Sequence, residues 1–183
     1  MLRRDLLRLL GGVSALAAIP TEDLFALGES THAGLRANTA GLGFFDAHQL
    51  QTVAAAADRI IPTTETPGAR EADCHRFAEK IIADHYDTTR QKRFITGLVD
   101  LDSRSSTLAQ KLFVDLTPQQ QDSVLAGVEK ETLASTTPAA SFWRDLKYLT
   151  IYGYYTSRIG IQDELEVNFY PGRFDGCAPL EAK

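Results

Sequence analysis

Cysteine is scarce in this 183-residue chain, which contains only Cys74 and Cys177. Covalent haem attachment requires a C-x-x-C-H pattern, and iron–sulfur clusters usually require four thiolates, so this chain should bind neither group. The sequence also lacks the glycine-rich patterns that bind nucleotides, G-x-G-x-x-G and G-x-x-x-x-G-K, and the G-x-S-x-G pattern of serine hydrolases. We therefore predict no catalytic residues and no cofactor, neither FAD nor NAD, in this chain.

Excess positive charge and long apolar runs are missing as well. The formal net charge is −5 and the sequence pI is near 5.4. Such a chain offers little to a phosphate backbone, so nucleic acid is not an expected partner. The apolar stretch 6–19 is shorter than the roughly 20 residues that cross a bilayer, and Arg8 and Gly11-Gly12 interrupt it.

The N-terminal segment has the order of an export signal, with basic residues first, then apolar ones, then small ones. Arg3 and Arg4 form a pair that leads into leucines, as in signals read by the twin-arginine translocase. We predict that residues 1–27 are a twin-arginine signal segment and that the protein is exported folded to the periplasm. The alternative is an ordinary amphipathic first helix, which Gly11-Gly12 would break. The sequence does not determine whether the signal is cleaved.

Two groups of polar residues suggest chemistry at first sight. Asp73-Cys74-His75 looks like a metal cluster, but neighbours on a helix point about 100° apart, so we predict no metal site there. In an oxidising periplasm Cys74 and Cys177 could form a disulfide, and the alternative is two separate buried residues. Glu164 and Glu166 are interpreted as solvated charges.

Apolar residues recur at helical spacing over most of the chain, which predicts an all-α single domain of about five helices. Asp46 with Gln49 and Thr117-Pro118 with Gln120 are typical N-terminal caps. Residues 28–43 lack apolar periodicity and are predicted to be a flexible tether, and the tail from about residue 160 should be irregular and packed on the bundle or on a partner. The predicted helices begin at Asp46, about Ala72, Thr88, Thr117 and Thr137, within a domain spanning 44–183.

Four separated motifs together resemble the gluconate 2-dehydrogenase subunit 3 family. They are the twin-arginine start, residues 57–62 with 66–72 (ADRIIP and TPGAREA), residues 153–157 (GYYTS) and residues 171–177 (PGRFDGC). The resemblance covers nearly the whole chain. It implies a non-catalytic small, or gamma, subunit that accompanies a large FAD-binding flavoprotein of the glucose–methanol–choline type, often with a cytochrome c subunit. In such a complex the small subunit would supply the export signal, and the assembly could associate with the membrane. A Cys74–Cys177 bridge would then tie the tail to the second helix.

The partner surface is expected where aromatic and turn residues are densest. Tyrosine is favoured in interfaces because it has a large apolar face and a polar tip. For residues 153–157 the alternative is that the tyrosines pack in the core with their hydroxyls hydrogen-bonded. A stand-alone periplasmic helical adaptor or binding protein remains the second functional reading of the chain. The predicted interface residues are Gly153, Tyr154, Tyr155, Tyr170, Pro171, Gly172, Arg173, Phe174 and Asp175.

Overall fold

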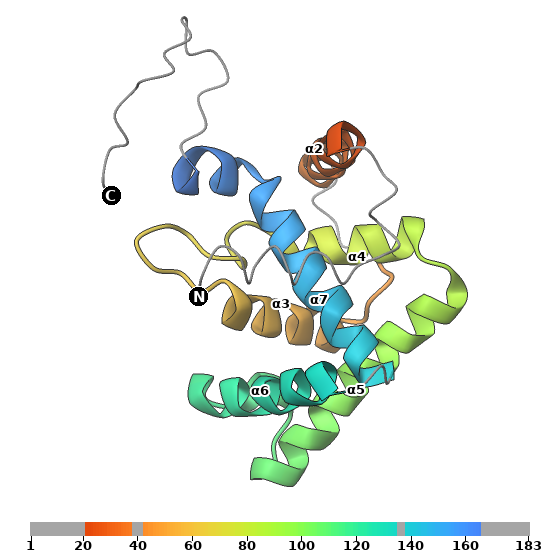
Figure 1. Cartoon of the computed structure of the whole chain (residues 1–183), viewed down its shortest axis with the longest axis vertical. Helices are drawn as coiled ribbons and strands as arrows, with labels where there is room; N and C mark the ends of the chain where they lie inside the picture. Colours follow the sequence, from red (N-terminus) through yellow and green to blue (C-terminus); the bar gives the residue numbers. More distant parts are fainter. Residues whose placement is uncertain (1–20, 38–41, 135–137, 166–183) are drawn as a thin grey trace, which may run out of the picture.

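Helices supply all the regular secondary structure of the described residues, which are 21–37, 42–134 and 138–165 of a computed structural model (Figure 1). This confirms the predicted all-α class. Six α-helices lie in these ranges, one more than predicted, together with a 3-10 turn and a π-helical turn. The elements are α2 (Thr21–Ala37), α3 (Ala47–Ile60), α4 (Cys74–His85), α5 (Thr88–Ala109), η1 (Phe113–Asp115), α6 (Pro118–Ala134), α7 (Pro138–Tyr155) and η2 (Ile159–Glu164).

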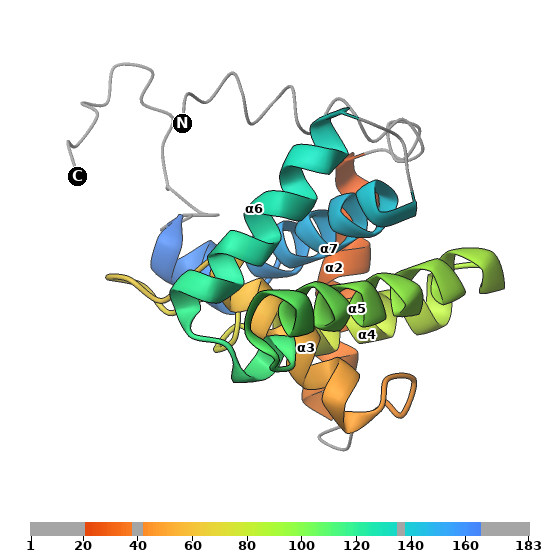
Figure 2. The same ribbon diagram turned by 90° about the horizontal axis from the view of Figure 1, so that it is seen from below.

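Helix α7 is the centre of the bundle. It packs against α3, α4, α5 and α6. In Figure 1 it crosses the middle of the molecule, with α2 towards one end and α6 towards the other, and Figure 2 shows α6 lying along one side of it. The inward-facing α7 residues Phe142, Leu146 and Leu149 are all fully buried. The other large buried side chains of the core include Val53, Phe77, Ile82, Phe94, Leu101, Phe113 and Val128.

Helices α5 and α7 approach closely at Gly97. The Phe142 ring of α7 lies over this glycine and stands edge-on to Phe94, with 5.0 Å between the ring centroids. A Cβ atom added at Gly97 would lie 2.1 Å from Phe142 Cγ. Glycine is therefore required here for space, and it sets the distance between the two helices.

The local caps explain where two helices begin. The Asp46 carboxylate accepts a hydrogen bond from the Gln49 amide at 2.7 Å, and the Gln49 side chain accepts from the Asp46 amide at 3.2 Å. Thr117 and Gln120 form the same reciprocal pair at the start of α6. Both predicted caps are confirmed, because each depends on neighbours three residues apart and not on the tertiary structure.

Several predicted boundaries need correction. Asp87 rather than Thr88 caps α5, because its carboxylate accepts from the amides of Thr89 and Arg90 at 2.8 and 2.9 Å. The helix ends at Ala109, since Gln110 adopts a left-handed conformation with φ of 55°. Helix α4 begins at Cys74, two residues later than the expected Ala72.

The largest correction concerns the predicted tether, residues 28–43. Residues 28–37 are helical and belong to α2, which also contains residues 21–27 of the predicted signal segment. Its inner face carries Gly28, Thr31 and His32 beside the apolar Leu27 and Leu35. A Cβ atom at Gly28 would lie 2.7 Å from Thr156 Cβ, so the helix fits tightly against the end of α7. Packing on residues distant in sequence thus stabilises a helix that local composition does not predict.

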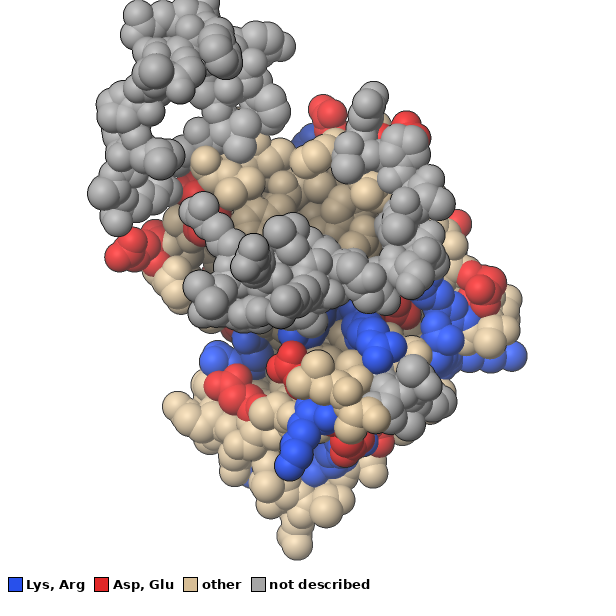
Figure 3. Space-filling model, viewed as in Figure 1, with Lys and Arg blue, Asp and Glu red and all other residues tan. Residues whose placement is uncertain are grey.

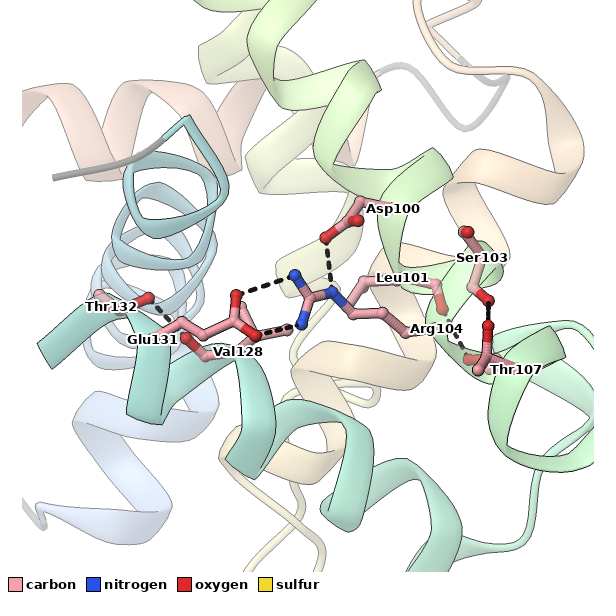
Figure 4. Close-up of polar contacts among 9 residues, drawn as sticks. Asp100, Leu101, Ser103, Arg104, Thr107, Val128, Glu131 and Thr132 are labelled. Carbon is pink, nitrogen blue, oxygen red and sulfur yellow. Dashed lines mark hydrogen bonds and ion pairs between the residues drawn. The ribbon is translucent and has the colours of Figure 1, made fainter. Parts of the chain in front are cut away.

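Ion pairs connect α5 and α6 at the surface of the bundle. Arg104 donates hydrogen bonds to both carboxylate oxygens of Glu131, at 2.8 and 2.9 Å, and to Asp100 one turn earlier, at 2.7 Å (Figure 4). The bonds to Glu131 raise the pKa of Arg104 above its usual range. Because Glu131 is half exposed, the pair contributes little to stability and mainly fixes how the helices are aligned.

The buried carboxylate of Glu79 fixes the chain before α3. Glu79 is 1% exposed, and its Oε1 accepts hydrogen bonds from the amides of Phe44 and Phe45, both at 3.0 Å. The ring of Phe45 then stacks on Phe94 in the core. This contact between α4 and the entry to α3 was not predicted from the sequence.

None of the helices in the described ranges is both long enough and apolar enough to span a membrane. The predicted irregular tail begins with an ordered π-helical turn, η2, in which the amide of Leu165 donates to the carbonyl of Gly160 at 3.0 Å. The remaining tail, 166–183, and the N-terminal residues 1–20 lie outside the described residues.

Candidate functional site

The connection between α3 and α4 is a tightly bonded loop that contains the TPGAREA motif. The amide of Ala69 donates to the carbonyl of Ile61 at 2.9 Å and closes the loop on the end of α3. The Glu71 carboxylate accepts from the Gly68 amide and from the Thr63 hydroxyl, both at 3.1 Å. The residues of the motif therefore hold the loop in one conformation.

The GYYTS motif at the end of α7 meets this loop. Tyr154 is 2% exposed, and its hydroxyl donates a hydrogen bond to the carbonyl of Pro67 at 2.8 Å. Its ring packs in a small buried cluster with Ala57, Ala69 and Cys74. Two motifs that are far apart in the sequence thus form one structural unit.

The same unit supports the turn that follows α7. The Ser157 hydroxyl donates to the carbonyl of Tyr154 at 2.6 Å and accepts from the Gly160 amide at 3.1 Å. Thr66 of the loop donates to the Glu164 carboxylate at 2.7 Å. Glu164, interpreted from the sequence as a solvated charge, is therefore a half-buried contact between η2 and the loop.

His32 attaches α2 to this unit. Its Nε2 lies 2.9 Å from the carbonyl of Gly153 and 3.2 Å from the Thr156 hydroxyl, so the ring donates from this nitrogen. The ring also stacks on Phe77 of α4, with 4.8 Å between the centroids. Burial is the main cause that lowers the pKa of His32 below its ordinary value. Sequence analysis missed this histidine because it falls in the segment assigned to the tether.

A cleft of about 320 Å³ lies between α2, the start of α4 and the turn after α7. Arg36 comes from the last turn of α2, Arg158 from the turn before η2, and Asp73 from the position just before α4. Asp73 has a left-handed conformation, and its side chain makes no capping hydrogen bond to α4. Buried Ser157 and His32 line the inner part of the cleft.

Only part of the predicted interface can be located. Gly153 and Tyr154 are buried inside the chain, whereas Tyr155 is 37% exposed. Gly153 and Tyr154 therefore pack in the core, where the Tyr154 hydroxyl is hydrogen-bonded. Of these three predicted interface residues, Tyr155 is the one that a partner could contact. The residues 170–175 lie outside the described residues, as do Arg3, Arg4 and Cys177.

Cys74 is a buried residue of the small cluster at the start of α4. Burial raises the pKa of its thiol to about 12, so the thiol stays protonated and unreactive at neutral pH. A bridge to Cys177 remains a prediction. The neighbouring His75 also has a pKa lowered mainly by burial, and its Nδ1 has no hydrogen-bond partner among the described residues.

His48 and Asp102 form the most enzyme-like pair of side chains. His48 Nε2 lies 2.6 Å from Asp102 Oδ2, and Asp102 Oδ1 accepts from the Phe113 amide at 2.9 Å. The pair thus joins α3, α5 and η1. Within 21–37, 42–134 and 138–165, no three His, Cys, Asp or Glu side chains are grouped so that they could hold a metal ion.

The fold is that of a small helical bundle in which buried polar side chains bind the chain's own backbone and a basic cleft lies at one end. A family model described as gluconate 2-dehydrogenase subunit 3 matches residues 47–176, which include α3 to α7, and the chain belongs to this family. No curated protein and no solved structure matches it.

Proposed function

We propose that this protein is a non-catalytic small subunit of an FAD-dependent dehydrogenase complex that oxidises a sugar, a polyol or a sugar acid. The observation that carries the proposal is the family match over residues 47–176, which spans the whole bundle apart from α2. In the proposed complex the FAD and the reaction belong to a large flavoprotein of the glucose–methanol–choline type, and a cytochrome c subunit would accept the electrons.

The second part of the proposal is that the small subunit escorts its partner out of the cell. The twin-arginine route accepts folded cargo, so a signal on one subunit could export a bound partner that has already received its FAD. The position of α2 supports this idea. This helix contains the end of the predicted signal segment, residues 21–27, and packs on α4 and α7 through His32, Phe77 and Gly153. A signal at the N-terminus would therefore be attached to the folded bundle.

Affinity purification of the tagged protein from its native host tests the subunit role. We expect a yellow partner with a flavin absorption spectrum and dehydrogenase activity towards sugars or polyols. A colourless monomer that is stable without any partner would refute the subunit role and favour the stand-alone adaptor.

The escort role is tested by replacing Arg3 and Arg4 with lysine. We expect the flavoprotein and its activity to disappear from the periplasm and to accumulate in the cytoplasm. Arg8→Lys is the matched control, because it makes the same change in the same segment outside the arginine pair. Undiminished periplasmic activity in the Arg3→Lys/Arg4→Lys variant would contradict the escort role.

A further inference from the structure

We propose that the cleft between α2, the start of α4 and the turn after α7 binds an acidic side chain of the flavoprotein partner, and that Arg36 and Arg158 hold its carboxylate. This inference rests on the proposed function. It adds the place and the chemistry of the contact, which the family assignment does not give.

The first argument is that Arg36 and Arg158 have no counter-ion among the residues that the structure describes. Arg36 and Arg158 are exposed and make no ion pair in the described part of the chain. A second cleft, about 260 Å³ between α3, α6 and α7, differs in this respect. Its cations are already neutralised, because Arg59 pairs with Asp122 at 2.8 Å and Lys147 with Glu129 at 2.6 Å.

The second argument is the local excess of positive charge in an acidic protein. Three arginines and two carboxylates line the cleft, an excess of one positive charge, and Arg36 and Arg158 are the two of these arginines that are exposed without an ion pair among the described residues. The N-terminus of α4, which is the positive end of its dipole, also borders the cleft, and the first turn of this helix holds no acidic residue. Elsewhere the charges are mixed, and Figure 3 shows basic and acidic side chains interspersed across the middle of one face.

The third argument is that the cleft is already organised. Ser157 and His32, which line its inner part, are bonded to the backbone of the α7 end, so the cleft does not have to rearrange to receive a ligand. Arg36 and Arg158 come from different elements and can contact a projecting carboxylate from two sides. Charge-assisted bonds of this kind, from guanidinium to carboxylate, are among the stronger polar contacts at interfaces.

Charge reversal at both arginines tests the proposal. The double variant Arg36→Glu/Arg158→Glu should lower the affinity for the purified flavoprotein by about tenfold or more, as expected when a contact between opposite charges becomes repulsive. Lys92→Glu/Lys130→Glu is the matched control, because it makes the same change of charge at exposed residues of α5 and α6 away from the cleft. Added salt should weaken the wild-type complex more than a complex made with Arg36→Gln/Arg158→Gln.

The outcomes separate the two proposals. Failure of the wild-type chain to bind a flavoprotein would overturn the proposed function, whereas equal binding by the wild type and both double variants would overturn only the cleft assignment. An equal loss of affinity in the cleft variant and in the lysine control would show that only the total charge of the protein matters, and it would overturn the cleft assignment. Citrate that stabilises the wild type through Arg36 and Arg158 without competing for the flavoprotein would identify a small anion as the ligand instead. The glutamine variant gives the same test if charge reversal impairs folding, which circular dichroism would show.

Discussion

Replacing Gly97 with alanine should destabilise the protein, although alanine is the better helix former. The new Cβ would lie 2.1, 2.4 and 2.6 Å from Phe142 Cγ, Cδ2 and Cβ. These atoms belong to a side chain that is 1% exposed and packed edge-on against Phe94, so the ring has no free space to move into. The helix α5 and the helix α7 would have to move apart.

The magnitude follows from two opposing effects. Adding a methyl group to a well-packed core costs about 1–3 kcal/mol, and the severe overlap places Gly97→Ala at the upper end. The higher helix propensity of alanine offsets about 1 kcal/mol. The free energy of unfolding should therefore fall by about 2 kcal/mol, which corresponds to a Tm lower by roughly 4–8 °C for a chain of this length.

Gly127→Ala is the matched control, because Gly127 also lies within a helix but a Cβ there meets nothing within 4 Å. This variant should be more stable than the wild type by up to about 1 kcal/mol. Urea and thermal unfolding followed by circular dichroism measure both changes. Equal stabilisation by the two substitutions would refute the close approach of α5 and α7. Phe142→Leu should partly rescue Gly97→Ala, because the smaller side chain makes room for the methyl group.

Two further predictions concern the contacts of the GYYTS motif. His32→Gln should reduce the loss of stability that occurs on acidification. The pKa of His32 in the folded protein lies below its ordinary value of 6.5, so the unfolded chain takes up the proton first. The free energy of unfolding of the wild type therefore falls as the pH drops below about 6.5. Arg36 and Asp73, the charged groups that face the ring, remain in both proteins, and equal slopes in unfolding curves measured against pH would contradict this role. Tyr154→Phe should lower the free energy of unfolding by about 1 kcal/mol, because the Pro67 carbonyl loses its hydrogen-bond donor. It should also speed hydrogen exchange at the Ala69 amide, which closes the same loop. Unchanged exchange would show that the bond does not hold the loop.

Local signals predicted α3 and α6 well, because caps and apolar spacing act over a few residues. Helix α2 was missed for the opposite reason. Its inner residues Gly28 and His32 have low helix propensity, and they fit only against Thr156 and Phe77, which lie far along the chain. Tertiary packing of this kind has no signature in a single local window.

The candidate site was predictable only in part. The loop and the GYYTS motif were singled out, but their mutual contact was not, because no sequence pattern states that a tyrosine will reach a carbonyl in another motif. Tyr154 and Tyr155 were treated alike, yet neighbours on a helix point about 100° apart, so one is buried and the other is exposed. The basic cleft could not be predicted, because Arg36 and Arg158 lie far apart in the sequence and meet only where α2 packs beside the turn after α7.

Helix α2 connects the two proposals physically. Its first residues, 21–27, belong to the predicted signal segment, and its last turn carries Arg36, one of the two arginines assigned to the partner. The helix is held in place by contacts to Phe77 of α4 and Gly153 of α7, so the cleft is complete only after the bundle has folded. Loss of the His32 contacts should therefore weaken binding of the flavoprotein, because these contacts hold α2, and with it Arg36, at the cleft. A chain that has not folded would carry the signal without the complete cleft, and binding of the partner would then select folded small subunits.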